Sequence, residues 1–352
     1  MGAAIQRAGG GGWGSLARLD RRYTHLITPS TRSNPELDLS RYDEEIAEEL
    51  RRYPPPPPGI ADLKELRSAC DAYFEGVRSR SSASTEGMLL RDDFVPSLVD
   101  DHEIPIRIYT PTASGSAGIL AYFHGGAFCL GGLELEEERC ISLARETPCI
   151  IVSVEYRLAP ENPFPLPLED CYSTLTWIAE HRDALNAAGS NLAVGGCSSG
   201  AALAASVAQL CRARNGPALA LQALLYPVLD SSLTEQSILE LTNDEIMDKR
   251  RMWSYYLDKG TSSSLFPGSP AAIDSLDLLA PALLVVAELD GLRDEAISYA
   301  RRLLAARVSV ELQLWPKAPH AFELFAPRSS LAQEAMRQQA AAIARGLEAI
   351  QA

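Results

Sequence analysis

The chain has 352 residues, a formal net charge of -14 at pH 7 and 46% hydrophobic residues. This length is enough to bury a sizeable core, and no apolar stretch approaches the roughly 18 uncharged residues that a membrane span needs. The negative charge disfavours nucleic acid as a partner, because neutralising phosphates requires a basic face. We therefore expect a globular protein with no membrane span and no nucleic-acid partner.

The opening stretch, MGAAIQRAGGGGWGS, lacks an apolar region after a basic one. It predicts a flexible glycine-rich lead and not a secretory signal. The seven cysteines form no CxxC pair, and an odd number in a chain of this length favours buried free thiols in a reducing compartment. We therefore expect a cytoplasmic protein.

Two amphipathic segments flank the proline run YPPPPPG at residues 53–59. Residues 34–52 are acidic with helical spacing, and residues 60–79 place apolar side chains three and four residues apart. Five consecutive prolines cannot lie inside a helix and predict a stiff linker. We assign residues 1–85 to an N-terminal part that consists of the flexible lead and these helices.

From about residue 88 onward, β-rich runs alternate with helical stretches such as 201–214 and 294–307. Several runs are continuously apolar, which is typical of strands buried on both faces. Alternating strands and helices indicate an α/β fold with a mostly parallel sheet, whose ligands bind at the carboxyl ends of the strands. The most distinct strands are expected at 104–111, 118–126, 149–158, 191–196, 221–230, 281–290 and 308–316.

The stretch between the fifth and sixth of these runs is helical and aromatic and does not continue the strand–helix alternation. An insertion at the strand ends is a position typical of a lid. We expect an α/β core at 86–230 and 273–352, interrupted by a cap insertion at 231–272.

The pentapeptide GCSSG at residues 196–200 follows an apolar strand and precedes a helix. This context fits the G-x-S-x-G turn, whose glycines allow a sharp strand-to-helix bend around a nucleophilic serine. The pattern alone is also typical of an ordinary turn. The hypothesis that Ser198 is a nucleophile therefore depends on finding a base and an acid.

Five histidines are available to act as the base. His25 lies in the lead, His102 in an acidic turn, and His181 late in a helix. His320 follows the last predicted strand, in KAPHAFELF, at a strand's carboxyl end. We predict that His320 is the base.

The acid is expected at the end of the strand 281–290, where Asp290 stands. Glu288 and Asp294 are rivals, but we expect Glu288 inside the strand and Asp294 in the first turn of the next helix. The order Ser198, Asp290, His320 matches that of α/β-hydrolases.

A tetrahedral intermediate also needs preorganised N–H donors for its oxyanion. FHGGAF, at residues 123–128, ends an earlier strand, and its glycines let the backbone approach the substrate. We predict that the amides of Gly125, Gly126 and Ser199 are the donors. A plain turn between a strand and a helix is the alternative for this stretch.

Taken together, these motifs resemble the hormone-sensitive-lipase-like carboxylesterases, the bacterial family IV type, of the α/β-hydrolase superfamily. HGGAF is similar to the family's HGGG motif, EYRLAPENPFP with Asp170 to its YRLAPE stretch, AELDGLRDEAISYARRL to the segment that carries the acid, and HAF to the HGF that carries the base. The resemblance implies an eight-stranded, mostly parallel sheet with flanking helices. It also implies a helical cap, built from helices of residues 1–85 and from the insertion at 231–272. It also implies that His124 shapes the oxyanion loop.

Three positions depart from the family pattern. Cys197 stands where the nucleophile motif usually has Asp or Thr, Ala127 replaces the third glycine, and Gly291 replaces the usual proline. Cys197 is either a small buried side chain or a reactive thiol.

The leading hypothesis is a serine esterase that hydrolyses short- to medium-chain carboxylic esters without a metal or an organic cofactor. Lactone or amide hydrolysis and acyl transfer or cyclisation on the same triad stay open, and a non-catalytic small-molecule receptor is a further alternative. The substrate pocket is expected to involve Ala127, Cys197, Trp253 and Tyr256, although an aromatic stripe on a helix often only packs. The sequence leaves a homodimer open.

Overall fold

The computed structural model describes residues 38–79, 84–112, 118–147, 149–241, 248–257 and 268–348. The predicted glycine-rich lead, with His25, lies outside these residues, as do two stretches of the predicted cap insertion, 242–247 and 258–267. All described residues belong to one compact unit, Leu37–Ala352.

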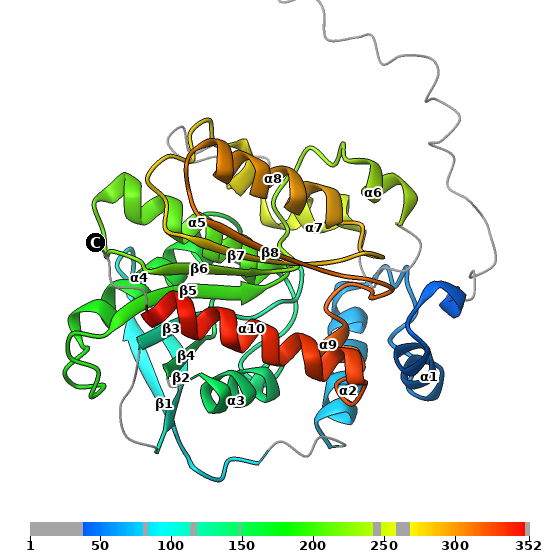
Figure 1. Cartoon of the computed structure of the whole chain (residues 1–352), viewed down its shortest axis with the longest axis horizontal. Helices are drawn as coiled ribbons and strands as arrows, with labels where there is room; N and C mark the ends of the chain where they lie inside the picture. The colour runs from blue at the N-terminus through cyan, green and yellow to red at the C-terminus, as the bar shows by residue number, and fades with distance from the viewer. Residues whose placement is uncertain are drawn as a thin grey trace, which may run out of the picture. The chain divides into compact units, whose positions relative to one another are not determined.

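Eight strands form a single sheet in the order β1-β2-β4-β3-β5-β6-β7-β8 (Figure 1). β2 runs antiparallel to both of its neighbours, β1 and β4, and every other pair is parallel. The strands are β1 (Met88–Pro96), β2 (Glu103–Pro111), β3 (Gly118–Phe123), β4 (Cys149–Val154), β5 (Asn191–Cys197), β6 (Leu221–Leu225), β7 (Ala282–Ala287) and β8 (Val310–Trp315).

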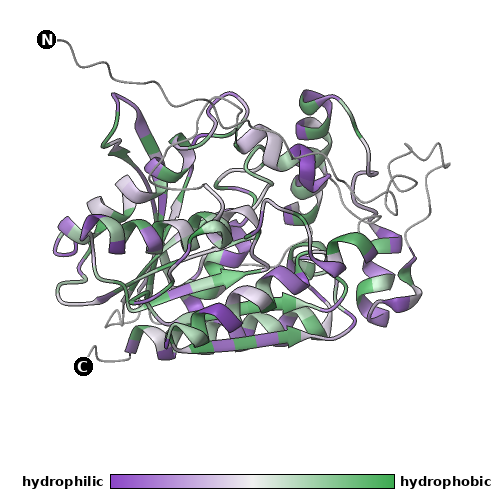
Figure 2. Cartoon of the chain, turned by 90° about the horizontal axis from the view of Figure 1, so that it is seen from above, coloured by the Kyte–Doolittle hydropathy of each residue, from purple (hydrophilic) through white to green (hydrophobic). Residues whose placement is uncertain are grey.

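Helices cover both faces of this sheet (Figures 1 and 2). α3 and α10 pack on one face, while α4, α5 and α8 pack on the other. The longer helices are α1 (Glu44–Arg52), α2 (Leu63–Ser79), α3 (Glu137–Glu146), α4 (Leu166–Glu180), α5 (Ser199–Arg214), α7 (Lys249–Tyr256), α8 (Arg293–Ala305) and α10 (Ser330–Glu348). The shorter ones are α6 (Gln236–Glu240), α9 (Phe322–Phe325) and the 3-10 turns Leu39–Arg41 and Pro270–Ala272.

The sheet is sandwiched because its central strands are apolar on both sides. Every residue of β3, β4, β6 and β7 is buried, so each strand needs a helical layer above and below. One hydrophobic core forms under α4, α5 and α8, and a second forms under α3 and α10. The predicted α/β-hydrolase fold with an eight-stranded sheet is confirmed.

The register of the strands aligns their carboxyl ends at one edge of the sheet. Phe123 at the end of β3 pairs with Gly196 of β5, and Cys197 pairs with Leu225 at the end of β6. Leu225 in turn pairs with Val285 of β7. The loops that carry HGGAF, GCSSG and Asp290 therefore leave the sheet at this edge.

The proline run separates two helices, as the sequence indicates. α1 begins after Asp43, whose carboxylate accepts hydrogen bonds from the amides of Glu45 and Ile46, and it ends at Arg52. Residues 54–57 have no regular structure, and α2 begins at Leu63.

Two details of the strand predictions need correction. Asp290 does not end the strand, because β7 stops at Ala287, and Glu288 lies after the strand and not inside it. The eighth strand, β1, is not among the runs singled out in the sequence. It is an edge strand that carries Arg91, Asp92 and Asp93, so it lacks the apolar pattern of a buried strand.

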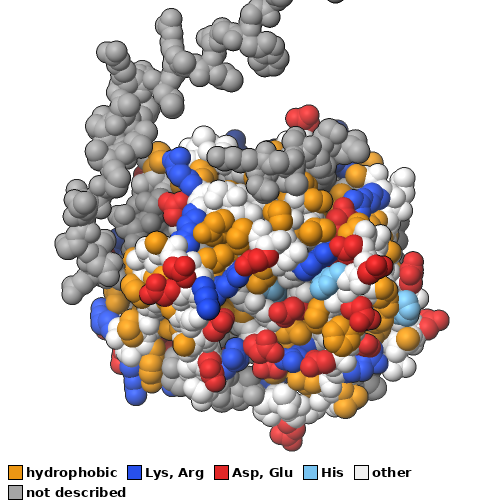
Figure 3. Space-filling model, turned by 180° about the vertical axis from the view of Figure 1, so that it is seen from behind, with side chains coloured by type: hydrophobic (Ala, Val, Ile, Leu, Met, Phe, Trp, Pro, Cys, Tyr) orange, Lys and Arg blue, Asp and Glu red, His pale blue; other side chains and the backbone are white. Residues whose placement is uncertain are grey.

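Among the described residues, no helix combines the length and the apolar character needed to cross a membrane. On the face shown in Figure 3, lysine and arginine side chains lie among aspartates and glutamates and are not gathered into one basic area.

Candidate active site

Ser198 occupies a strained turn between β5 and α5. Its φ angle is 56°, in the left-handed region that side chains rarely adopt. A Cβ at Gly196 would lie 2.4 Å from the carbonyl oxygen of Phe123, and a Cβ at Gly200 would lie 2.0 Å from the same atom. Only glycine fits at these two positions, as the sequence predicts for a nucleophile turn.

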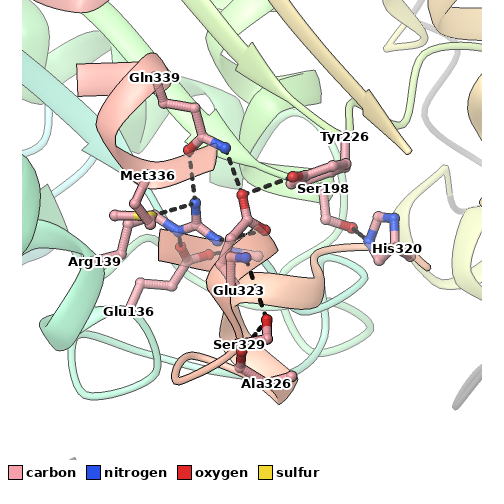
Figure 4. A network of polar contacts seen from close by, with 12 residues as sticks. Glu136, Arg139, Ser198, Tyr226, His320, Glu323, Ala326, Ser329, Met336 and Gln339 are labelled. Atoms are coloured by element: carbon pink, nitrogen blue, oxygen red, sulfur yellow. Dashed lines mark hydrogen bonds and ion pairs between the residues drawn. The ribbon is translucent and has the colours of Figure 1, made fainter. Parts of the chain in front are cut away.

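The structure brings Ser198, His320 and Asp290 together (Figure 4 shows the first two). The Oγ of Ser198 lies 3.0 Å from Nε2 of His320, and Nδ1 of His320 lies 2.7 Å from Oδ2 of Asp290. The serine hydroxyl can donate to Nε2, while the Nδ1 proton is donated to the carboxylate. This tautomer leaves Nε2 free to accept the proton of the serine.

The surroundings of Asp290 keep its carboxylate ionised. Its side chain is 3% exposed, and burial alone would raise its pKa, but the contact with His320 and the charge of Lys249 outweigh burial and lower it. The other carboxylate oxygen accepts from the amide of Leu292 at 2.9 Å. Asp290 is therefore held in one orientation beside the imidazole.

The two rival acids point elsewhere. Glu288 is exposed and accepts from the amide of Lys317 at 2.7 Å. Asp294 lies in the first turn of α8, as predicted, and accepts from the amide of Ser237 at 2.9 Å. Only Asp290 of the three contacts His320.

The predicted oxyanion donor Gly125 needs correction. Its amide already donates a hydrogen bond of 2.8 Å to Oε1 of Glu136, a buried carboxylate behind the loop. No sequence pattern indicates this contact, because Glu136 belongs to the acidic run ELEEER, which has the composition of a solvated surface. Gly126 and Ala127, the next two residues of the loop, border the pocket with Ser198.

His124 is fully buried and does not take part in the proton relay. Its ring stacks on Tyr156 with centroids 4.2 Å apart, and its Nδ1 donates to the carbonyl of Gly125 at 2.6 Å. Burial lowers the pKa of His124, which keeps the ring neutral. The Tyr156 hydroxyl also donates to the carbonyl of His124 at 2.7 Å, so both residues fix the loop backbone.

The YRLAPE stretch ties this loop to the rest of the core. Arg157 pairs with the buried Asp170 at 2.7 Å and with Asp100 at 2.6 Å. Arg67 of α2 pairs with Glu161 at 2.7 Å and donates to the carbonyl of Cys129 at 2.8 Å. The N-terminal helix α2 is thereby anchored beside the oxyanion loop.

A pocket of about 480 Å³ opens at Ser198. Apolar side chains dominate its wall, and they come from α2, from the loop after β3, from α7 and from α9. Its lining includes Phe74, Leu130, Val228, Met252 and Phe325. Both segments predicted to form a cap therefore contribute to the wall, α2 from the N-terminal part and α7 from the insertion.

Two of the predicted substrate-binding residues do not reach this pocket. The α7 residues in its lining are Lys249 and Met252, while Trp253 and Tyr256 are buried against Phe128. The Tyr256 ring stacks on Phe128 with centroids 3.9 Å apart, and the Trp253 ring lies 5.5 Å from it. These aromatic rings pack the core, which is the alternative that the sequence left open.

The other two predicted contacts border the pocket. Ala127 has a φ angle of 54° and lies in the lining. Cys197 also borders it, but the residue is 0% exposed, and burial raises the pKa of its thiol well above the usual range. The thiol therefore matches a buried structural cysteine better than a reactive one.

Lys249 is a site residue that sequence reasoning missed. It is 7% exposed, lines the pocket and lies close enough to Asp290 to lower the pKa of that carboxylate. Burial lowers the pKa of Lys249 itself. In the described part of the chain, His, Cys, Asp and Glu side chains form no group of three or more that could hold a metal ion.

An eight-stranded α/β sheet with a hydrogen-bonded Ser–His–Asp arrangement at its strand ends defines the class of α/β-hydrolases. A family model described as alpha/beta hydrolase fold matches residues 120–324. LipN of Mycobacterium tuberculosis, a carboxylic ester hydrolase, is 38% identical over 62% of this chain, and the match spans 61% of LipN. The carboxylesterase NlhH of the same organism is 36% identical over 70% of this chain and 80% of NlhH.

Solved structures of esterases are also similar to this chain. A bacterial heroin esterase is 34% identical, covers 89% of this chain and all of its own, and superposes with a TM-score of 0.81. The esterase LipW of Mycobacterium marinum is 31% identical with a TM-score of 0.77, covering 88% of this chain and 97% of LipW. The chain belongs to the hormone-sensitive-lipase-like family of α/β-hydrolases.

Proposed function

We propose that the protein is a serine carboxylesterase that hydrolyses short- to medium-chain carboxylic esters through an acyl-enzyme on Ser198. The contact that carries this proposal is the 3.0 Å approach of His320 Nε2 to the Ser198 Oγ, with Asp290 on the far side of the imidazole. The names of the relatives LipN and NlhH support the same reaction class.

In this mechanism, His320 takes the hydroxyl proton as Ser198 attacks the ester carbonyl. Asp290 stabilises the imidazolium, which then protonates the departing alcohol. Water repeats the sequence on the acyl-enzyme and releases the acid. Each proton moves between Ser198 or water, His320 and the leaving group, so the cycle needs no metal or redox cofactor.

We further propose that the amides of Gly126, Ala127 and Ser199 bind the oxyanion. Ser199 is the first residue of α5, where amides have no partner within the helix and the helix dipole favours negative charge. Gly126 and Ala127 are the two residues after Gly125, whose amide is already hydrogen-bonded to Glu136. Removal of a single such donor is expected to lower kcat by roughly 100- to 1,000-fold.

The apolar pocket supports an ester with a modest apolar acyl or alcohol group. A volume of about 480 Å³ is at the lower end of small-molecule sites, which span roughly 300–1,000 Å³. We propose that α2 and α7 act as a cap that excludes water from this space.

Hydrolysis of a p-nitrophenyl ester series from acetate to palmitate, with wild type and Ser198→Ala, tests the proposal. The rate should peak on short to medium chains and disappear in the variant. A folded wild-type protein that hydrolyses none of these esters would overturn the assignment.

We also propose a cytoplasmic location. The seven cysteines are all free and buried, which suits a reducing compartment. Fractionation of the producing cells, with the hydrolytic activity followed in each fraction, tests this location. Activity confined to the medium or to the membrane fraction would contradict it.

A further inference from the structure

Arg139 of α3 lies between two buried carboxylates near the active site (Figure 4). Its Nε is 2.9 Å from Oε2 of Glu136, and its Nη2 is 3.7 Å from Oε2 of Glu323. The Arg139 side chain is 2% exposed, and those of Glu136 and Glu323 are 0% and 2% exposed. A guanidinium stays charged under such conditions, so all three groups interact without screening by water.

On one side, Glu136 holds the oxyanion loop. Its Oε1 accepts from the amide of Gly125 at 2.8 Å, and its Oε2 accepts from the hydroxyl of Tyr122 at 2.6 Å. Gly125 is directly followed by Gly126, a proposed oxyanion donor. A shift of the Glu136 carboxylate therefore moves the backbone that must meet the oxyanion.

On the other side, Glu323 holds the surroundings of the base. It lies on α9, three residues after His320, and its Oε1 accepts from the Tyr226 hydroxyl at 2.7 Å. The Tyr226 ring meets the His320 ring edge-on, with centroids 5.8 Å apart. Glu323 thus fixes both the chain segment that carries His320 and a wall against which its ring packs.

The C-terminal helix α10 supports Arg139 from a third direction. The side-chain oxygen of Gln339 accepts from Nη1 of Arg139 at 3.1 Å, and its amide nitrogen donates to Glu323. Met336 Sδ also lies 3.6 Å from Nη1. Buried ion pairs of this kind add little net stability compared with apolar packing, so stability alone is a weak reason for placing three charges here.

We propose that Arg139 is a positioning residue for catalysis. Through Glu136 and Glu323 it holds the oxyanion loop and the segment that carries His320 in a fixed position relative to each other. This inference rests on the esterase reaction proposed above. Arg139 touches neither substrate nor the reacting atoms, and it acts through the two carboxylates. Misplacement of catalytic groups by about 1 Å can lower a rate by about 100-fold. If the two segments are held less firmly relative to each other, kcat should therefore fall.

The first test compares wild type, Arg139→Met and Arg139→Lys in hydrolysis of p-nitrophenyl butyrate. Active sites are counted from the p-nitrophenolate released by diethyl p-nitrophenyl phosphate. Arg139→Met should lower kcat per active site by about 10- to 100-fold and leave KM nearly unchanged. Arg139→Lys keeps one charge but cannot bridge both carboxylates, and it should recover part of the lost kcat.

Ile178→Ala serves as the control for loss of stability. Ile178 is fully buried on α4 and has no part in this network, so this variant should lower the melting temperature without lowering kcat per active site. An Arg139→Met enzyme that is destabilised in the same way but retains the wild-type kcat would overturn the inference.

Arg139→Met leaves two buried carboxylates facing each other and is at risk of not folding. The double variant Arg139→Met/Glu323→Gln avoids this, because it keeps the formal charge of the cluster at that of one carboxylate. It should fold and still show the lowered kcat, whereas wild-type kcat in this variant would also overturn the proposal. If wild type itself releases no p-nitrophenolate from either reagent, the esterase assignment fails instead.

Discussion

The backbone amide of Gly125 donates to the carboxylate of Glu136 at 2.8 Å, and this contact determines which amides of the oxyanion loop are free. The donors expected from the sequence include Gly125, but its N–H points into the protein toward a buried acid. The proposed oxyanion donors of this loop are therefore the amides of the next two residues, Gly126 and Ala127.

Gly126→Ala should lower kcat by at least about 100-fold, with a smaller effect on KM. Gly126 has a φ angle of 122°, and a Cβ there would lie 2.1 Å from the carbonyl oxygen of Leu130, so the loop must move. Steady-state kinetics on p-nitrophenyl butyrate measures the loss. Gly189→Ala is the matched control, since Gly189 also has a positive φ but faces open space. Wild-type kcat in Gly126→Ala would show that this loop does not bind the oxyanion.

Met252→Ala should shift the chain-length preference toward longer esters. Met252 lines the pocket from α7, so its truncation lengthens the space available to substrate. The ratio of kcat/KM for octanoate to that for acetate is expected to rise by about tenfold. Trp253→Phe, on the same helix, changes a core-packing ring and should leave this ratio unaltered. If Trp253→Phe shifts this ratio and Met252→Ala does not, the substrate contacts Trp253, and the assignment of Met252 to the pocket wall is wrong.

The thiols should be unreactive in the folded protein. Burial raises the pKa of Cys70 to about 11 and of Cys129 and Cys211 to about 12, and it raises that of Cys197 well above its usual range. Titration with a disulfide reagent should label all seven cysteines in guanidinium chloride, and native protein should react far more slowly. Rapid labelling of one native thiol that disappears in Cys197→Ala would show that Cys197 is a reactive group.

As the pH rises from about 4.5 to about 8, the free energy of unfolding of wild type should decrease relative to that of Glu295→Gln. Burial raises the pKa of Glu295 from 4.5 to about 8, so in this window the folded state binds a proton that the unfolded state has already lost. Stability declines with pH when the folded state binds more protons, by at most about 1.4 kcal/mol per pH unit for one group. Glu295→Gln removes this titration.

Urea unfolding of both proteins at intervals from pH 5 to pH 8 measures that difference. Glu295 also accepts from the amide of Leu229 at 2.6 Å, a contact that an amide oxygen can retain. A constant difference between the two proteins across the pH range would contradict the raised pKa.

The sequence was sufficient for the parts of the site that chemistry constrains most tightly. Gly196 and Gly200 are sterically required around Ser198, and a serine nucleophile needs a base and an acid at neighbouring strand ends. These requirements leave few residues to choose from. The continuous apolar strands likewise predicted a sheet covered on both faces.

The remaining features depend on contacts between distant segments. Glu136 looks like one acid in a charged surface run, and only the fold turns it toward Gly125. Periodicity placed Met252 and Trp253 on one helix but did not indicate which side of that helix faces the pocket. The apolar pattern did not predict the edge strand β1, because an exposed strand carries no continuous apolar run.

The most direct test of the whole account is mass spectrometry of the protein after treatment with diethyl p-nitrophenyl phosphate. Attack by an activated serine displaces p-nitrophenolate and leaves a diethylphosphoryl group on its oxygen. We predict one adduct per chain, located on Ser198, with none formed in His320→Ala over the same period. A folded wild-type protein that remains unmodified, or that is modified on another residue, would contradict the central claim that His320 and Asp290 activate Ser198.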